Sequence, residues 1–196
     1  LTLDESGIPT RAEERYAIAK RILAVAAEYG IAKKDLIFDP LALTVSADQN
    51  AARETLRAVE MITNGLGCHT SLGVSNVSFG LPQRDAVNST FFALSMERGL
   101  SAAIMNPYST EMMKSYYAFC ALHGLDDNCA DYVAFAEGLP QAAIPVTSGV
   151  SAPSKREAEL LTELQTAIVK GLKEQAAACT KKQLQSEAAL EIVQGE

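Results

Sequence analysis

Four polar side chains stand at the ends of four short apolar runs in this chain. Asp4 ends "LTLD", Asp39 ends "LIFD", Asn76 ends "TSLGVSN" and Asn106 ends "SAAIMN". A carboxylate accepts hydrogen bonds, and an asparagine amide both donates and accepts them. Polar groups next to a buried strand are costly unless something hydrogen-bonds to them in return. The pattern therefore predicts a polar ligand site at the strand ends.

The third run has the most unusual composition. In "SLGVSNVSFG", Leu72, Val74, Val77 and Phe79 alternate with small or polar residues, as a strand requires. Its middle nevertheless contains two serines and Asn76. We take this run as a strand whose polar end serves a ligand.

The four runs come 30 to 37 residues apart, and each is followed by an amphipathic helical segment. Apolar strands that alternate with helices are typical of parallel βα units, whose strands are buried on both faces. Capping-box patterns at Thr10-x-x-Glu13 and Ser46-x-x-Gln49 predict helix starts, as does Ser109 for the fourth helix. In the first helix, a stripe at helical spacing predicts the face on the sheet: Ile18, Ile22, Ala26 and Tyr29.

The predicted fold class is α/β, as one half of a TIM (β/α)8 barrel followed by an all-α segment. In such a barrel the carboxyl ends of the strands line the active site. A whole barrel takes about 250 residues, whereas the four units end near Gly124. We interpret them as strands 5–8, the C-terminal half. An open Rossmann-type sheet is the alternative, but no GxGxxG follows any strand.

Three segments are predicted along the chain. Residues 1–138 hold the four units and a short helix closed by Gly138, and residues 139–153 form a linker with several prolines. Residues 154–196 form helices with a break at Gly171, and we expect this segment to be truncated.

Composition narrows the function classes. The net charge of -7 argues against nucleic acid or an anionic membrane as a partner. The four cysteines show no paired spacing, which indicates a cytoplasmic protein. Cys120 and His123 have a spacing that can bind zinc, but two ligands do not make a site, so no metal is predicted.

Three stretches resemble the pterin-binding barrel of methyltetrahydrofolate methyltransferases, particularly that of cobalamin-dependent methionine synthases. They are "FDPLALTVS", "LGVSNVSFGLPQR" and "SAAIMNP". The tail, "TAIVKGLKEQAAACTKKQL…ALEIVQGE", is similar to the start of the helical cap that precedes the cobalamin domain of those enzymes. The resemblance implies a dihydropteroate synthase-like pterin-binding fold.

The resemblance also implies roles for individual residues. Asp39 matches the aspartate that accepts two N–H bonds from the pterin ring, while the alternative is an aspartate that caps the next turn. Asn76 matches the catalytic asparagine near N5 of the folate. Gly73 and Ser75 match positions close to the folate, and Arg84 matches an arginine that reaches back to the site. A surface arginine is the alternative for Arg84. Asn106 is included as a substrate-binding residue on its strand-end position alone.

By this resemblance the function is transfer of a methyl group from N5 of methyltetrahydrofolate to cob(I)alamin, within methionine synthesis from homocysteine. The cobalamin-binding domain of the same or a partner protein is the implied partner, and this chain alone is expected to be inactive. Two alternatives remain: a methyltetrahydrofolate:corrinoid protein methyltransferase, and a non-catalytic corrinoid-docking scaffold. Dihydropteroate synthase is disfavoured because no lysine occurs between His69 and Arg84.

Overall fold

The computed structural model describes residues 1–140, 163–169 and 173–185. Two compact units divide the chain, Leu1–Pro140 and Gln141–Glu196. Most of the predicted linker, the start of the predicted tail and Gly171 lie outside the described residues. No helix in the described ranges is long and apolar enough to cross a membrane.

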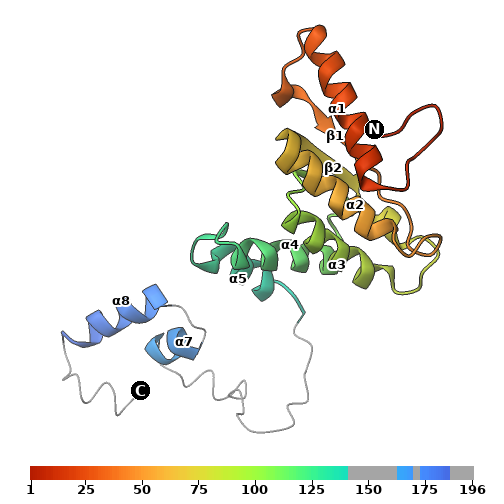
Figure 1. Cartoon of the computed structure of the whole chain (residues 1–196). Helices are drawn as coiled ribbons and strands as arrows, with labels where there is room; N and C mark the ends of the chain where they lie inside the picture. Colours follow the sequence, from red (N-terminus) through yellow and green to blue (C-terminus); the bar gives the residue numbers. More distant parts are fainter. Residues whose placement is uncertain (141–162, 170–172, 186–196) are drawn as a thin grey trace. The chain divides into compact units, whose positions relative to one another are not determined.

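A small parallel sheet lies at the centre of the first unit. Its strands are β1 (Ile37–Phe38), β2 (His69–Gly73) and β3 (Ala102–Ile104), in the order β1-β2-β3. Phe38 pairs with Thr70, and Gly73 pairs with Ile104. Because each strand continues into a helix before the next strand, the predicted parallel βα arrangement is confirmed for these three units (Figure 1).

The helices of the first unit are α1 (Ala12–Glu28), α2 (Ala51–Glu60), α3 (Arg84–Glu97), α4 (Thr110–Leu122) and α5 (Ala130–Glu137). A π-helix, η2 (Met61–Leu66), continues α2, and three 3-10 turns, η1 (Lys33–Asp35), η3 (Val74–Ser78) and η4 (Asp127–Cys129), join other elements. The second unit contains α7 (Glu163–Val169) and α8 (Lys173–Gln183), in which Leu164 and Ala167 are buried. The prediction that Gly138 closes a short helix is confirmed, because it is the C-cap of α5.

Two of the predicted strands differ from the structure. Leu1–Asp4 forms no ladder, since Asp4 pairs only with Gly7 in an isolated bridge, although the Thr2 N–H donates to the Asp39 carbonyl at 3.1 Å. The third strand ends at Gly73, and Asn76 lies in η3 rather than in the strand. Short polar side chains compete for backbone hydrogen bonds, which favours a turn over a ladder.

One of the three predicted helix starts is correct and two are wrong. Ser109 caps α4 as predicted, because its hydroxyl accepts the Met112 N–H at 3.4 Å. The predicted helix starts at Thr10 and Ser46 are wrong, because α1 and α2 begin after Arg11 and Asn50, without a side-chain cap. The first N–H of α1, that of Ala12, is instead bound by the Glu54 carboxylate at 2.7 Å. A tertiary contact from α2 thus replaces the local cap.

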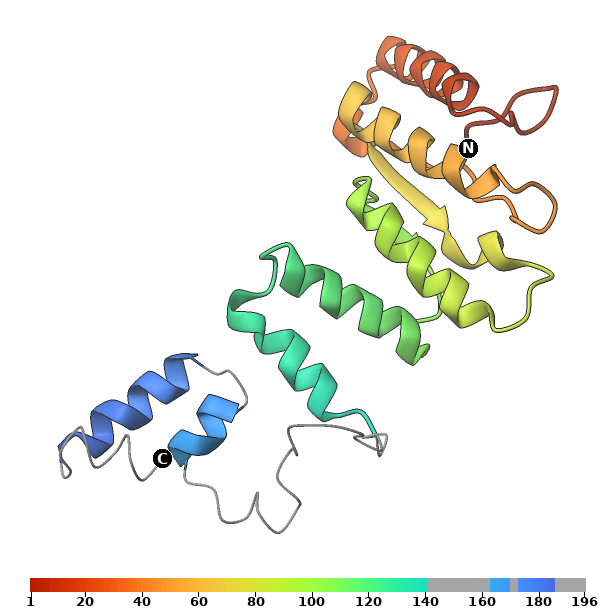
Figure 2. The ribbon, with the colours of Figure 1, turned by 60° about the horizontal axis from the view of Figure 1, so that its bottom comes forward.

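Only one face of the sheet is covered within the described residues. The main core packs Leu72 and Val74 against residues of α2 and α3 such as Val59 and Phe91, and Figure 2 shows α1, α2 and α3 in a row beside β2. On the other face, Ile37 is 55% exposed and Ile104 is 70% exposed. Burial on both faces is therefore not observed within the described residues, because these strands have a helical layer on one side only there.

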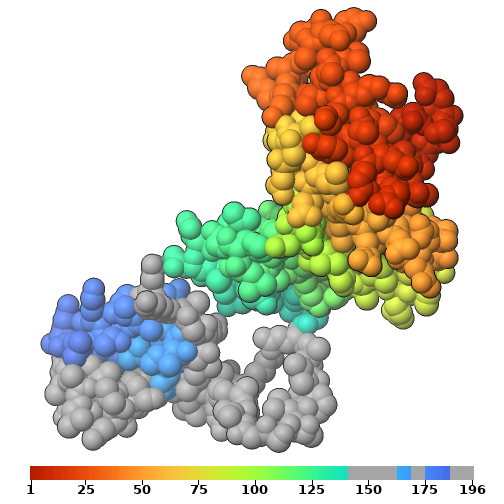
Figure 3. Space-filling model, viewed as in Figure 1, coloured from red at the N-terminus to blue at the C-terminus, as the bar shows by residue number. Residues whose placement is uncertain are grey.

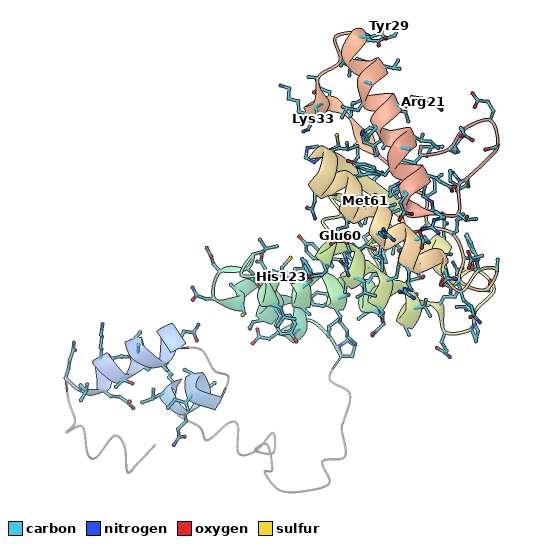
Figure 4. The ribbon with its side chains drawn as sticks, in the orientation of Figure 1. Arg21, Tyr29, Lys33, Glu60, Met61 and His123 are labelled. Carbon is cyan, nitrogen blue, oxygen red and sulfur yellow. The ribbon has the colours of Figure 1, made fainter. Side chains whose placement is uncertain are left out.

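The predicted inner face of α1 is correct for its first part. Ile18 and Ala26 are buried and Ile22 is half-buried, whereas Tyr29 is 80% exposed at the end of the helix. Figure 4 places Tyr29 at the far tip of α1. The stripe ends one turn earlier than its spacing predicts, because α1 ends at Glu28 and Tyr29 is the C-cap residue beyond it.

Candidate functional site

The carboxyl ends of the three strands point to the same end of the unit. The segments that follow β1 and β2, together with the N-terminal segment, lie at this end, where Figure 2 shows them as loops before α2, α3 and α1. Asp39 comes directly after β1, η3 follows β2 without a break, and Asn106 comes two residues after β3. Parallel strands place the residues that follow them along one edge. The structure thus gathers the predicted strand-end residues on one side.

Asp39 caps the turn that follows it and keeps binding capacity. Its Oδ1 accepts the N–H of Leu41 at 2.8 Å, and its half-buried carboxylate makes no other hydrogen bond within the described part of the chain. A carboxylate has about four acceptor positions. The turn-capping role that the sequence left open is observed, and it leaves room for two N–H donors of a ligand.

Asn76 is exposed in η3, and its amide folds back over Gly73. A Cβ built on Gly73 would lie 3.0 Å from Nδ2 of Asn76. The missing side chain at Gly73 therefore makes room for this amide, which has no hydrogen-bond partner among the described residues. Both the donor and the acceptor of Asn76 are available to a ligand.

Arg84 braces the turn that carries Asn76. Its Nη2 donates to the Ser75 carbonyl at 2.8 Å and its Nε donates to Ser78 Oγ at 2.9 Å. The guanidinium carbon also lies 4.7 Å from the centre of the Phe79 ring. The surface-arginine alternative does not describe this side chain, because its donors fix η3 from the start of α3. Ser75 contributes its carbonyl to the brace.

Asn106 closes its own turn. Its Oδ1 accepts the Tyr108 N–H at 3.0 Å and its carbonyl accepts the Ser109 N–H at 3.2 Å. Asp4 behaves in the same way with Ser6, and these two hydrogen bonds lower the pKa of the Asp4 carboxyl. Both side chains have local duties that explain their positions.

Hydrogen bonds tie the strand-end segments together. The hydroxyls of Thr44 and Ser46 both donate to the Phe79 carbonyl, at 2.8 and 2.7 Å, and the Val45 N–H donates to the Val77 carbonyl at 3.0 Å. The loop after β1 therefore lies directly on the turn after β2, as the adjoining orange and yellow-green atoms of Figure 3 show. Ser46, predicted as a helix cap, instead connects the loop after β1 to the turn after β2 by its hydrogen bond to Phe79.

Arg15 is a residue of this region that the sequence patterns above do not single out. It lies on α1 with 0% exposure, and its Nε donates to the Pro9 carbonyl at 2.8 Å. Its Nη1 donates to the carbonyls of Pro40 and Leu41, at 3.0 and 3.1 Å, and to Thr55 Oγ1 at 3.1 Å. The spacing in the sequence could have predicted its burial, because Arg15 falls on the same helical stripe as Ile18.

The electrostatics of Arg15 show that its burial is costly. Burial lowers the pKa of the guanidinium, and the carboxylates of Glu54 and Asp48 act in the opposite sense. The Glu54 carboxylate is itself bonded to the α1 N-terminus. Arg15 is thus held by backbone carbonyls and one hydroxyl instead of a direct ion pair, which suits the planar fork of an arginine.

Leu41, beside Asp39, has a left-handed backbone with φ +64°. This conformation costs a non-glycine residue about 1–2 kcal/mol. Its carbonyl accepts from Arg15 and from Thr55 Oγ1 at 3.2 Å, while its N–H binds Asp39. The surroundings therefore hold Leu41 in a conformation that it would otherwise avoid.

His123, which has zinc-binding spacing with Cys120, makes other contacts in the structure. His123 stacks on Phe119 with ring centres 4.0 Å apart, and its Nε2 lies 3.1 Å from the Glu97 carboxylate. Among the residues that the structure describes, no group of three or more His, Cys, Asp or Glu side chains is placed to hold a metal ion.

Comparison with known proteins finds similar methyltransferases. The methylcorrinoid:tetrahydrofolate methyltransferase of Eubacterium limosum is 32% identical over 140 residues, which are 70% of this chain and 52% of that protein. The methionine synthases of Mycobacterium tuberculosis and Mycobacterium leprae are each 32% identical over 114 residues, which are 54% of this chain and 10% of those proteins. The chain thus spans about half the length of the first relative and much less of the other two.

A family model described as pterin binding enzyme matches residues 7–106, which is half of the chain. The match runs from Gly7 through all three strands to Asn106, and so includes the loop after β1 and the turn after β2. The chain belongs to the pterin-binding enzyme family.

Proposed function

We propose that the strand-end segments of this chain bind methyltetrahydrofolate and serve methyl transfer between its N5 and a corrinoid. The observation that carries the proposal is the arrangement of Asp39 and Asn76 at one edge of the sheet, on two loops that hydrogen-bond to each other. In this proposal residues 1–138 are one half of a pterin-binding barrel. The bare sheet face, with Ile37 and Ile104, is then part of the barrel interior.

Asp39 binds the pterin ring in this account. The pterin presents two parallel N–H donors, N3–H and the 2-amino group, and one carboxylate can accept both. Because Oδ1 is already bonded to the Leu41 N–H, the plane of the carboxylate is set before the ligand arrives. Charge-assisted hydrogen bonds of this kind contribute about 1.5–3 kcal/mol.

Asn76 acts at N5, the nitrogen that exchanges the methyl group. A tertiary amine becomes a better leaving group as it gains a proton or a strong hydrogen bond. The amide of Asn76 has no partner among the described residues and can donate to N5 or accept from a protonated N5. A hydrogen bond that strengthens as charge develops stabilises the transition state more than the ground state.

Cobalamin would supply the methyl acceptor or donor of this reaction. Neither histidine of the chain stands at the strand-end edge, because His69 begins β2 and His123 is engaged with Glu97 and Phe119. Among the described residues, the strand-end edge therefore offers no histidine ligand for a corrinoid. We assign the corrinoid to the cobalamin-binding domain of the same or a partner protein, with residues 154–196 as the proposed start of its helical cap.

Two reactions fit the proposed site. Methionine synthesis from homocysteine is supported by the similarity to two methionine synthases. Methyl exchange between tetrahydrofolate and a corrinoid protein is supported by the relative that matches the larger share of this chain. Both use the same half-reaction at the folate, so Asp39 and Asn76 keep their roles in either case.

Calorimetric titration of methyltetrahydrofolate into the chain tests the proposal. This readout suits a protein that contains no tryptophan. We expect Asp39→Asn to weaken binding about tenfold or more, since it replaces charge-assisted hydrogen bonds by neutral ones. The matched control is Asp35→Asn, because Asp35 is exposed and lies before β1, at the opposite end of the strand.

In the full-length parent protein, Asn76→Ala should weaken folate binding less than it slows methyl transfer to the corrinoid. Its control is Asn64→Ala, an exposed asparagine at the amino end of β2. Equal binding by wild type, Asp39→Asn and Asn76→Ala contradicts the proposal and favours the non-catalytic scaffold. A separate assay distinguishes the two reactions. Methylation of homocysteine by the wild-type parent protein with its corrinoid identifies the methionine synthase reaction.

A further inference from the structure

We infer that Arg15 is a positioning residue for the Asp39 carboxylate, acting through the left-handed backbone of Leu41. The inference rests on the proposed role of Asp39 in pterin binding. It assigns a positioning role in ligand binding to a fully buried residue of α1.

The connection between the two side chains has two steps, and each is a hydrogen bond. Nη1 of Arg15 donates to the Leu41 carbonyl at 3.1 Å, and the Leu41 N–H donates to Oδ1 of Asp39 at 2.8 Å. Nη1 of Arg15 also donates to the Pro40 carbonyl at 3.0 Å, and this carbonyl belongs to the same peptide unit as the Leu41 N–H. Arg15 therefore holds the peptide units on both sides of Leu41, and a rotation of the Pro40–Leu41 unit would move the donor that orients the carboxylate.

A guanidinium is suited to this position because its acceptors come from separate segments. They belong to the N-terminal loop at Pro9, to the loop after β1, and to Thr55 on α2. Two nitrogens of one rigid plane, Nε and Nη1, reach all four acceptors, while Nη2 is buried without a hydrogen-bond partner among the described residues. The three donors of a lysine ammonium sit on one atom and cannot reach acceptors spread in this way. Because the charge is fully buried without a direct carboxylate partner, packing alone does not explain an arginine here.

The left-handed residue is the adjustable part of the connection. Leu41 has φ +64°, a conformation that glycine adopts without strain. Leu41→Gly should therefore keep the Leu41 N–H in place with less help from Arg15. This gives a rescue experiment that a general structural role of Arg15 would not pass.

The experiment compares the full chain carrying Arg15→Lys, Asp39→Asn, both substitutions, and Arg15→Lys with Leu41→Gly. The control is Arg21→Lys, the same change at an exposed position of the same helix (Figure 4). The probe is methyltetrahydrofolate, with affinity measured by calorimetry. The NMR coupling between the amide and α protons of residue 41 reports its φ without any ligand.

We expect Arg15→Lys to lower the affinity about tenfold and to change the coupling at Leu41. In the Asp39→Asn background the same change should add less than about twofold, because the two residues act through one connection. Leu41→Gly should restore most of the affinity to Arg15→Lys. An unchanged affinity of Arg15→Lys, or a loss that adds fully to that of Asp39→Asn, overturns the inference.

Thr55→Val covers the case in which Arg15→Lys does not fold. It removes one acceptor of Nη1 and one donor to Leu41 while leaving the guanidinium in place. We expect about a threefold weaker affinity, again restored by Leu41→Gly. Wild-type affinity in Thr55→Val overturns the inference. If Asp39→Asn binds as well as wild type, the pterin site itself is refuted, while the coupling at Leu41 still shows whether Arg15 holds the loop.

Discussion

The loops after β1 and β2 are both fixed by an arginine, but in opposite settings. Arg15 reaches the first loop from α1, with 0% exposure and four acceptors. Arg84 reaches the second loop from the start of α3. It is half-buried, bonds to two acceptors and lies over the ring of Phe79. In both cases at least one backbone carbonyl of the loop accepts from the guanidinium, so each loop is held partly through its main chain.

The difference lies in what each arginine leaves to the loop. At the first loop the carboxylate of Asp39 depends on a peptide that the buried guanidinium holds. At the second, the amide of Asn76 rests on Gly73 and does not touch Arg84. We therefore expect substitutions of Arg15 to affect folding and binding together, and those of Arg84 to affect mainly the order of η3.

The largest effect is expected from Arg15→Met. Three carbonyls lose their donor and a buried hydroxyl loses a partner, so the free energy of unfolding should fall by about 3 kcal/mol or more. Urea denaturation measures it, with Arg21→Met as the exposed control, for which about 0.5 kcal/mol or less is expected. A fall below about 1 kcal/mol would remove the basis for the comparison.

Arg84→Met should cost less, about 1–2 kcal/mol, because only two acceptors lose a donor and one of them, on Ser75, belongs to a half-buried residue, although Ser78 is buried. The stack on Phe79 contributes within this range. The same urea measurement applies, and the ratio of the two losses sharpens the comparison. Equal losses for Arg15→Met and Arg84→Met would show that burial does not distinguish the two braces.

Much of this region was predictable from the sequence, and the reason is local. Parallel βα order follows from apolar runs at regular spacing, and Ser109 was recognised because a cap acts on the next turn only. The strand-end positions of Asp39 and Asn106 follow from the same pattern.

The remaining features depend on contacts across long sequence separations. Arg15 bonds to Pro40 and Leu41, 25 and 26 residues away, and Ser46 bonds to Phe79, 33 residues away. A capping-box pattern at Ser46 cannot compete with such a tertiary acceptor. The start of η3 at Val74 was likewise hidden, because the apolar residues were counted as a strand pattern, whereas the buried residues of η3 are Val74, Val77 and Ser78, and Phe79 is exposed.

The third strand end provides a reference without an arginine. Ser109 caps α4 and its hydroxyl lies 3.2 Å from the Asp85 carboxylate, so Ser109→Ala should lower the free energy of unfolding by about 1 kcal/mol. It should leave methyltetrahydrofolate affinity within about twofold, because no proposed ligand contact depends on it. A larger loss of affinity, measured by calorimetry, would extend the site to the loop after β3.

The smallest change in stability is expected from Gly73→Ala. Gly73 has φ -75°, which alanine adopts readily, so the free energy of unfolding should change by about 0.5 kcal/mol or less. The added methyl group would meet Nδ2 of Asn76 at 3.0 Å and must displace it. Methyl transfer should therefore fall although the fold is intact. Unchanged transfer in Gly73→Ala would separate Asn76 from the reaction.

The central claim is that the loops after β1 and β2 together form the pterin site, and an NMR titration of the ¹⁵N-labelled chain with methyltetrahydrofolate tests it most directly. The account predicts that the side-chain amide of Asn76 and the backbone amide of Leu41 shift with the same affinity, while the Asn64 side chain and the Asp35 amide at the other end of the strands stay in place. Shifts confined to other surfaces, or none at millimolar ligand, would contradict it.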